Sequence, residues 1–514
     1  MSSPIQEQKI VSALIPDCLT IIFRCLTTNK DLHSCLLVNK FWANVVVPIL
    51  WEAPFRNTYD FIPSCKIIPT YIACLPDESK KILSKEYNGK YKQRLTNTPL
   101  FNYPSFLTEI QYDELCNAIE RSEGSCYAEK VVIEICKMIS VRSTTLRRFS
   151  ICNKFINQFL NNKSILLLRL PGSDNLFRNL KNFECGHQWS TQKISLLEAM
   201  AEQCHKITRL AVKVWREDEA NVLAKLVREQ KSLKSFVLLN SNHYASTLLK
   251  ALISQRDTLT SIEFKDMNNC DLINAQVINV LTQCTNITTL NFRNCEEIDC
   301  PIFLPLGSAY SQLTSFHYSC GNLKSENVKV PAILLSTLFK SNGNTLEHIS
   351  LSWNRPHSDV DVSQIIIIIA QHCHKLIDLE IPVTTTEEIT LILGSCDQLK
   401  NLIIHIMGQF DVGTVLHHFI KHQHPSLVNL KFITLPYAIV FLDFDKVTDF
   451  IEYSITSEHS FKELSIDSPL CLYYSIVSEE EFQKLQQIYP DNFKFFYTEW
   501  SHYISILIKF NFHK

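Results

Sequence analysis

The chain has 514 residues, of which 46% are hydrophobic and 20% charged, with 50 basic against 52 acidic residues. This length exceeds one ordinary core and predicts several domains or an array of repeats. The near-neutral charge gives no indication of a nucleic-acid or membrane-surface partner. The longest purely apolar run, Ile365 to Ala370, is too short to span a bilayer.

The N-terminus lacks a basic region followed by an apolar stretch and a cleavage site, so we expect an intracellular protein of the cytoplasm, the nucleus or both. The 19 cysteines are then expected to be reduced thiols. No two of them lie closer than five positions, the spacing of Cys295 and Cys300, so no Cys-x-x-Cys pair exists for zinc or redox chemistry. We expect no metal ion and no cofactor.

Residues 10–53 predict three short helices. Their apolar residues recur at helical spacing: Leu19, Ile22, Phe23 and Leu26; Leu32, Cys35 and Leu36; Val45 and Val46. Pro16 suits the first position of the first helix, Asp31 can cap the second, and the third is expected to end near Pro48. So short a segment cannot bury this apolar surface alone, and therefore needs a partner or the following domain.

Residues 54–145 predict a mostly helical connector. Pro76 to Lys85 and Phe106 to Arg121 have helical spacing, and Asn88 to Pro104 reads as a loop because it contains Gly89 and Pro99.

Residues 146–514 carry a repeated pattern of an apolar residue, two polar residues, an apolar residue, any residue and a last apolar residue. The pattern occurs twelve times, at Leu146-Phe149-Ile151, Leu180-Phe183-Cys185, Ile207-Leu210-Val212, Leu233-Phe236-Leu238, Leu259-Ile262-Phe264, Ile287-Leu290-Phe292, Leu313-Phe316-Tyr318, Leu346-Ile349-Leu351, Leu376-Leu379-Ile381, Leu399-Leu402-Ile404, Leu427-Leu430-Phe432 and Phe461-Leu464-Ile466. The first residues are 23 to 34 positions apart, mostly within the range of leucine-rich repeats. The two slots after the first apolar residue are polar in 22 of 24 cases, which random placement in so apolar a chain would not give.

This pattern predicts an α/β fold of stacked parallel strands. The last two apolar residues lie on one side of a short strand, and a single strand cannot bury them, so neighbouring strands stack into a sheet with helices on its other face. Ile194, Leu197 and Ala201 form a helical stripe in one of the intervening segments. The sequence thus predicts a leucine-rich-repeat solenoid of about twelve repeats with a C-terminal cap.

In each predicted strand, the residue between the last two apolar slots points away from the core, onto the concave face. These residues are Ser150, Glu184, Ala211, Val237, Glu263, Asn291, His317, Ser350, Glu380, Ile403, Lys431 and Ser465. Of this row, Glu184, Glu263, Asn291, His317, Glu380 and Lys431 are the candidate residues for binding a target protein. The alternative is that the row is merely solvated and that targets bind at loops or at the C-terminal end.

Two clusters contain residue types that could carry out chemistry. His418 and His422 are four positions apart and could place two metal ligands on one helical face, but no acidic or cysteine ligand lies nearby, which favours a solvated helix end. Cys373 lies between two histidines, an arrangement that a Cys–His nucleophile would use. It occupies a small apolar slot three residues before a strand, which recurs at Cys204, Cys284, Cys373 and Cys396 and explains the residue structurally. We predict no catalytic residue and no enzyme activity.

The N-terminal residues Ile15-Pro16, Leu19, Ile22-Phe23, Leu26, Asp31-Leu32, Val38, Trp42 and Trp51 resemble the F-box in order and spacing. The usual Leu-Pro start is Ile-Pro here, which is a conservative change. The resemblance covers about a tenth of the chain and coincides with the leucine-rich array, a pairing known in F-box proteins.

Membership of that family implies that the helical motif binds a Skp-type adaptor and, through it, a cullin scaffold. Carried over residue by residue, Pro16, Leu19, Ile22, Phe23, Leu36, Val38 and Trp42 would contact the adaptor or hold the contacting surface; some of them could merely pack the motif's own core. The implied function is the substrate-recognition subunit of a Skp–cullin–F-box ubiquitin ligase. The alternatives are a leucine-rich-repeat binding scaffold without a ligase role and a self-contained ligase with a catalytic cysteine.

Overall fold

The structure is a computed structural model that describes residues 16–26, 28–56, 63–86, 98–151, 170, 172–186, 191–241, 244–267, 274–295, 298, 301–320, 330–353, 362–422, 424, 426–435, 438–441, 444–456, 461–469, 479–488, 493–500 and 503–510. The chain divides into two compact units, Met1–Leu233 and Lys234–Lys514, and each is described by itself. Among the described residues, no helix combines the length and apolarity that crossing a membrane requires.

In the described part of the first unit, the three predicted helices come first: α2 (Pro16–Arg24), α3 (Asn29–Leu36) and α4 (Lys40–Leu50). Two details differ from expectation. The side-chain oxygen of Thr28 accepts the Asp31 N–H at 3.1 Å, so Thr28 and not Asp31 is the N-cap of α3. Helix α4 runs two residues past Pro48, and its own N-cap, Asn39, accepts the Trp42 N–H at 2.8 Å.

The described residues that follow form the helices α5 (Pro63–Ala73), α6 (Asp77–Glu86), α8 (Tyr112–Glu123) and α9 (Ser125–Arg142), with a short 3-10 turn η1 (Tyr103–Phe106). The prediction of one helix from Phe106 to Arg121 was partly wrong, because residues 109–111 form a strand, β1 (Glu109–Gln111). Leu107, Ile110 and Tyr112 are buried at the same spacing as the apolar triplets of the repeats. The strand ladder therefore begins one strand before the repeat at Leu146. Most of the predicted loop, residues 88–97, lies outside the described residues.

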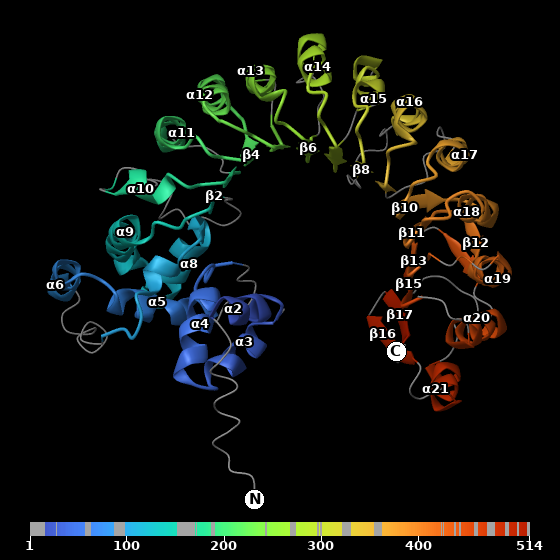
Figure 1. Ribbon diagram of the computed structural model, residues 1–514, viewed down its shortest axis with the longest axis horizontal. Coiled ribbons are helices and arrows are strands. Elements are labelled where there is room, and N and C mark those ends of the chain that lie inside the picture. Colours follow the sequence, from blue (N-terminus) through green and yellow to red (C-terminus); the bar gives the residue numbers. More distant parts are fainter. Residues whose placement is uncertain are drawn as a thin grey trace, which may run out of the picture. The chain divides into compact units, whose positions relative to one another are not determined.

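Strands β1, β2 (Arg148–Ile151), β3 (Asn182–Cys185) and β4 (Arg209–Lys213) follow one another in parallel register. One face of these strands is covered by the helices α10 (Ser173–Phe177), α11 (Thr191–Gln203) and α12 (Glu217–Arg228) (Figure 1). The helical stripe predicted before Ile207 falls within α11, which confirms it.

The second unit continues the same alternation. Its elements are β5 (Ser235–Leu239), α13 (Ala245–Ala251), η3 (Leu252–Gln255), β6 (Ser261–Lys265), α14 (Ala275–Thr282), β7 (Thr289–Arg293), η5 (Pro301–Phe303), α15 (Leu306–Ala309), β8 (Ser315–Cys320), α16 (Ala332–Asn342), β9 (His348–Trp353), α17 (Val362–His372), β10 (Asp378–Val383), α18 (Thr386–Leu393), β11 (Asn401–Ile406), β12 (Gln409–Asp411), α19 (Val412–His422), β13 (Asn429–Thr434), β14 (Ile439–Phe441), α20 (Phe444–Thr456), β15 (Glu463–Pro469), α21 (Glu479–Ile488), β16 (Phe493–Trp500) and β17 (Tyr503–Phe510). Strands β5 to β11, β13 and β15 are parallel neighbours, whereas β17 and β16 close the end with antiparallel pairing. Strands β12 and β14 form a separate parallel pair.

Each unit thus has the leucine-rich-repeat architecture, and the predicted fold class is confirmed. All twelve predicted strands are present, and all 36 residues of the apolar triplets are buried, none more than 4% exposed. The strands are also joined by a recurring main-chain contact: the carbonyl before one strand accepts two successive N–H groups of the next repeat. Thr314 accepts in this way from Glu347 at 2.9 Å and from His348 at 3.0 Å.

Candidate functional site

The N-terminal helical motif exposes apolar side chains, although its own core is closed. Its exposed apolar residues are Ile21 and Ile22 in α2, and Leu37, Val38 and Phe41 around the start of α4; we refer to these five together as the apolar patch. Ile22 is 49% exposed, Val38 55% and Leu37 82%. These are five of the thirteen large apolar side chains that are exposed among the described residues, within a stretch of 21 positions. Such a concentration is typical of an interaction surface.

A small buried cluster supports this patch. It consists of Leu19, Phe23, Leu32 and Val46, with Leu26, Cys35, Leu36, Trp42, Val45, Ile49 and Leu50 packed around it. The rings of Phe23 and Trp42 meet edge to face with centroids 5.0 Å apart. The core therefore depends on contacts among all three helices.

The seven predicted adaptor-binding residues separate into three groups. Pro16, Ile22 and Val38 are exposed, Leu36 and Trp42 are half-buried, and Leu19 and Phe23 are buried. In this chain Leu19 and Phe23 hold the surface rather than form it. Sequence reasoning missed Ile21, Leu37 and Phe41, whose signal was an apolar residue outside the helical stripe.

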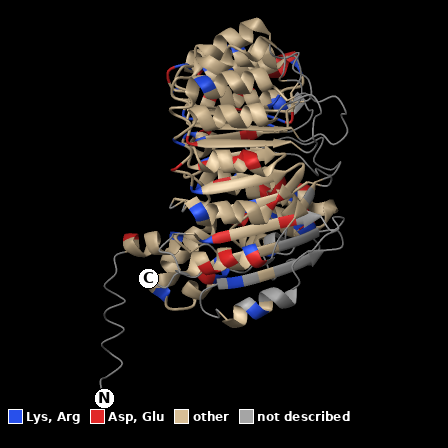
Figure 2. Ribbon diagram, turned by 90° about the vertical axis from the view of Figure 1, so that its right-hand side faces the viewer, with Lys and Arg blue, Asp and Glu red and all other residues tan. Residues whose placement is uncertain are grey.

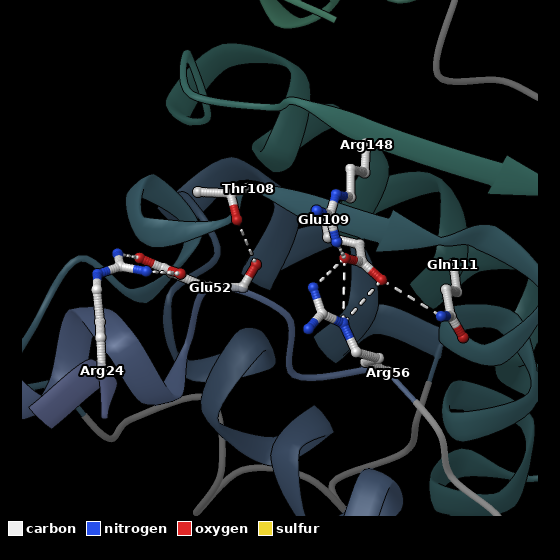
Figure 3. Close-up of polar contacts among 7 residues, drawn as sticks. All are labelled: Arg24, Glu52, Arg56, Thr108, Glu109, Gln111 and Arg148. Atoms are coloured by element: carbon white, nitrogen blue, oxygen red, sulfur yellow. Dashed lines mark hydrogen bonds and ion pairs between the residues drawn. The ribbon is translucent and has the colours of Figure 1, made fainter. Parts of the chain in front are cut away.

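A set of polar contacts joins this motif to the first strand (Figure 3). The carbonyl of Glu52 accepts the N–H groups of Thr108 at 2.9 Å and Glu109 at 3.1 Å, and the Glu52 carboxylate pairs with Arg24. The Glu109 carboxylate forms an ion pair with Arg56 and a longer one, 3.5 Å, with Arg148 on β2. Burial alone would raise the pKa of the Glu109 carboxyl, but these cations outweigh it and hold the pKa below its usual value.

The face of the strands away from the helices, the strand face, is hollowed in both units. In the first unit a hollow of about 370 Å³ lies over β1 to β4 and is lined by Glu109, Gln111, Arg148, Phe149, Ser150, Asn182, Phe183, Glu184, Arg209 and Ala211. In the second unit a hollow of about 330 Å³, the C-terminal hollow, lies over β7 to β11 and is lined by Asn291, Arg293, Ser315, Phe316, His317, His348, Ile349, Ser350, Asp378, Leu379, Glu380, Asn401 and Ile403.

Of the six candidate target-binding residues, the structure brings Asn291, His317 and Glu380 together in the C-terminal hollow, and Glu184 lines the other hollow. The remaining two are ion-paired on the strand face: Glu263 with Arg293 at 3.3 Å and Lys431 with Asp467 at 2.7 Å. The predicted row took one residue from each strand. It therefore missed the polar residues two positions away on the same face, among them Asp378 and His348.

Hydrogen bonds fix the charged groups of the C-terminal hollow. The Glu380 carboxylate accepts from Ser350 Oγ at 2.5 Å and lies 2.8 Å from His405 Nε2, and the contact with His405 is the main reason that its pKa is lowered. The Asp378 carboxylate lies 2.6 Å from His348 Nδ1 and accepts from the Asn401 amide. Burial, with help from nearby Arg293, lowers the pKa of His317 to about 4, so this imidazole is neutral at pH 7.

The surroundings of the recurrent cysteines and of the His418 and His422 pair do not favour chemistry. Burial raises the pKa of the thiols of Cys204, Cys373 and Cys396 to about 12 and that of Cys284 to about 11, which disfavours the nucleophilic thiolate. The rings of His418 and His422 stack with centroids 4.2 Å apart. No group of three or more histidine, cysteine or acidic side chains among the described residues is arranged to hold a metal ion.

No family model and no curated protein matches this sequence. Among solved structures, a chain of the crystal structure of the Rad7 and Elc1 complex in yeast is similar, with a TM-score of 0.35 and 14% sequence identity over 71% of this chain and 92% of that chain. A likeness of this size carries no argument, and the architecture rests on the strands, registers and burial described above.

Proposed function

We propose that this protein is the substrate-recognition subunit of a Skp–cullin–F-box ubiquitin ligase. The N-terminal motif binds a Skp-type adaptor and thereby a cullin scaffold, and the strand face of the repeats binds a target protein. The chain supplies binding only, and the chemistry of ubiquitin transfer belongs to other subunits.

The observation that carries this proposal is the apolar patch. Water-exposed apolar side chains of this number are costly on a free surface, and the core beneath them is complete without them, so they are available to a partner. Their position in a segment that resembles the F-box favours the adaptor as that partner. The contacts of Glu52 and Glu109 join the motif to the first strand, as a receptor that presents its target at a fixed place requires.

The test is co-purification of the full chain with a Skp-type adaptor. Replacing Ile22 and Val38 together with aspartate is expected to abolish co-purification, because apolar anchors at an interface centre cost about 2 kcal/mol or more when lost. The matched control replaces Ile333 and Leu391 with aspartate. Both are exposed apolar residues on repeat helices, so this variant should leave co-purification unchanged. Undiminished adaptor binding by the Ile22 and Val38 variant would refute the assignment.

A binding scaffold without a ligase role remains the second candidate. It is favoured if the full chain captures a target from an extract while neither it nor its N-terminal motif retains the adaptor.

A further inference from the structure

The C-terminal hollow is built around one straight row of side chains on adjacent strands. Strand register aligns Asn291 with His317, His317 with Ser350, and Ser350 with Glu380. Three strand spacings of about 4.8 Å place the two ends of this row about 14 Å apart. An extended polypeptide covers that distance in about four residues, so the hollow has the length of a short peptide segment.

One end of the row offers an unused amide. Asn291 is only 8% exposed, lines the hollow, and its side chain has no hydrogen-bond partner among the described residues. Its amide atoms are not among the enclosed, unpartnered polar atoms of the described residues, so they reach the hollow and are free to hydrogen-bond a ligand in place of water. The side chain presents a donor and an acceptor together, the same pair that a peptide group presents in complementary order.

The other end of the row is acidic. Asp378 and Glu380 are two positions apart on the same face of β10, and each of their carboxylate oxygens has one hydrogen-bond contact with the surrounding side chains. A carboxylate has about four acceptor sites, so further sites remain open toward the hollow. The one Lys or Arg side chain in the lining, Arg293, already pairs with Glu263 at 3.3 Å. Figure 2 shows acidic and basic residues on the strands of this unit.

We propose that the C-terminal hollow binds an extended segment of the target protein that carries a lysine or arginine side chain. Asn291 hydrogen-bonds the main chain of the segment, and Asp378 and Glu380 receive its cation. This inference rests on the proposed function only in taking the ligand to be part of the target; adaptor binding plays no role in it.

The experiment uses the full chain and a labelled, flexible peptide of about five residues with arginine at alternate positions. A matched peptide carries glutamate at those positions, and binding is followed by fluorescence anisotropy at low salt. Asp378→Asn together with Glu380→Gln removes the charge while keeping the size of both side chains. Glu387→Gln with Asp397→Asn removes the same charge from exposed positions outside the hollow.

We expect the arginine peptide to bind and the glutamate peptide not to bind. The Asp378 and Glu380 variant should weaken binding about tenfold or more, and the control pair less than about twofold. Asn291→Ala should also weaken binding of the arginine peptide, because the hydrogen bond to the peptide main chain is lost. Equal binding by wild type and the Asp378 and Glu380 variant, preference for the glutamate peptide, or no binding of either peptide would each overturn the proposal. Adaptor co-purification, measured on the same variants, separates these outcomes from failure of the proposed function.

Discussion

The main-chain carbonyl of Glu52 accepts a hydrogen bond of 2.9 Å from the N–H of Thr108, 56 positions later. The same carbonyl also accepts the next N–H, that of Glu109, at 3.1 Å. Rungs within each unit repeat this form: the Thr108 carbonyl, for example, accepts from Arg147 at 2.8 Å and from Arg148 at 3.0 Å. The end of the helical motif therefore takes the place of a preceding repeat, and β1 is built directly upon it.

The first prediction concerns the ion pair beside this rung. Arg56 is half exposed and Glu109 mostly buried, so we expect a double-mutant cycle with Arg56→Met and Glu109→Gln to give a coupling energy of about 1 kcal/mol. Urea denaturation measures it. The exposed pair of Arg216 and Asp218 is the control and should couple by less than about 0.5 kcal/mol. Equal coupling in the two pairs would show that Glu109 gains nothing from its partial burial.

The second prediction separates the surface of the N-terminal motif from its core. Phe23→Ala should destabilise the motif by about 3 kcal/mol, because Phe23 fills the cluster with Trp42. Ile22→Ala should cost less than about 0.5 kcal/mol, because Ile22 is half exposed. Circular dichroism and limited proteolysis report the difference. A structural loss in Ile22→Ala equal to that in Phe23→Ala would place Ile22 in the core.

The apolar triplets predicted the strands well because each triplet has one physical solution, a strand with its alternate residues in the core. The triplet at Leu107, Ile110 and Tyr112 was missed because the helix that follows at once has apolar residues that extend the pattern. The sequence also did not reveal which residues of α2 are buried and which are exposed. Ile22 and Phe23 lie on one helical stripe, yet a helix of nine residues in so small a motif buries only part of that stripe.

The third prediction concerns the cysteines. Cys18, Cys25 and Cys126 are exposed, whereas Cys204, Cys284, Cys373 and Cys396 are buried with raised pKa values. Iodoacetamide should therefore modify the first group quickly in the native protein and the second only after unfolding. Mass spectrometry of digested protein assigns each site.

Cys373→Ala extends this test to function. It should cost about 1 kcal/mol through a small cavity and leave ubiquitin transfer in a reconstituted ligase unchanged. Rapid native labelling of Cys373, or loss of transfer by a folded Cys373→Ala protein, would favour a self-contained ligase.

The predicted target-binding row shows where sequence reasoning reaches its limit. It placed Asn291, His317 and Glu380 on one face because their offset from the apolar slots is the same in each strand. The contact of Glu380 with His405 requires two strands 25 positions apart in sequence to pair in one register, and a second polar residue two positions further along β11. Side-chain rotamers decide such contacts, and spacing alone does not specify them.

The last prediction follows from the lowered pKa of His317. Burial, with Arg293, lowers it from 6.5 to about 4, while Glu380 opposes the shift. Between these two pH values the unfolded chain binds a proton at this histidine and the folded chain does not, so stability rises with pH across the window. The neutral histidine therefore destabilises the folded state progressively as the pH falls from 6.5 toward 4.

Replacing His317 with glutamine removes the group that binds this proton in the unfolded chain. The variant should therefore lose less stability than wild type as the pH falls. Urea denaturation of wild type and His317→Gln at a series of pH values gives the difference between the two proteins, in which the contributions of the other titrating groups largely cancel. We expect wild type to lose more stability than the variant between pH 6.5 and 4, with parallel curves above that window. His33→Gln, at an exposed position of α3, is the matched control. Curves for His317→Gln that stay parallel to wild type throughout would show that His317 titrates alike in the folded and unfolded chains.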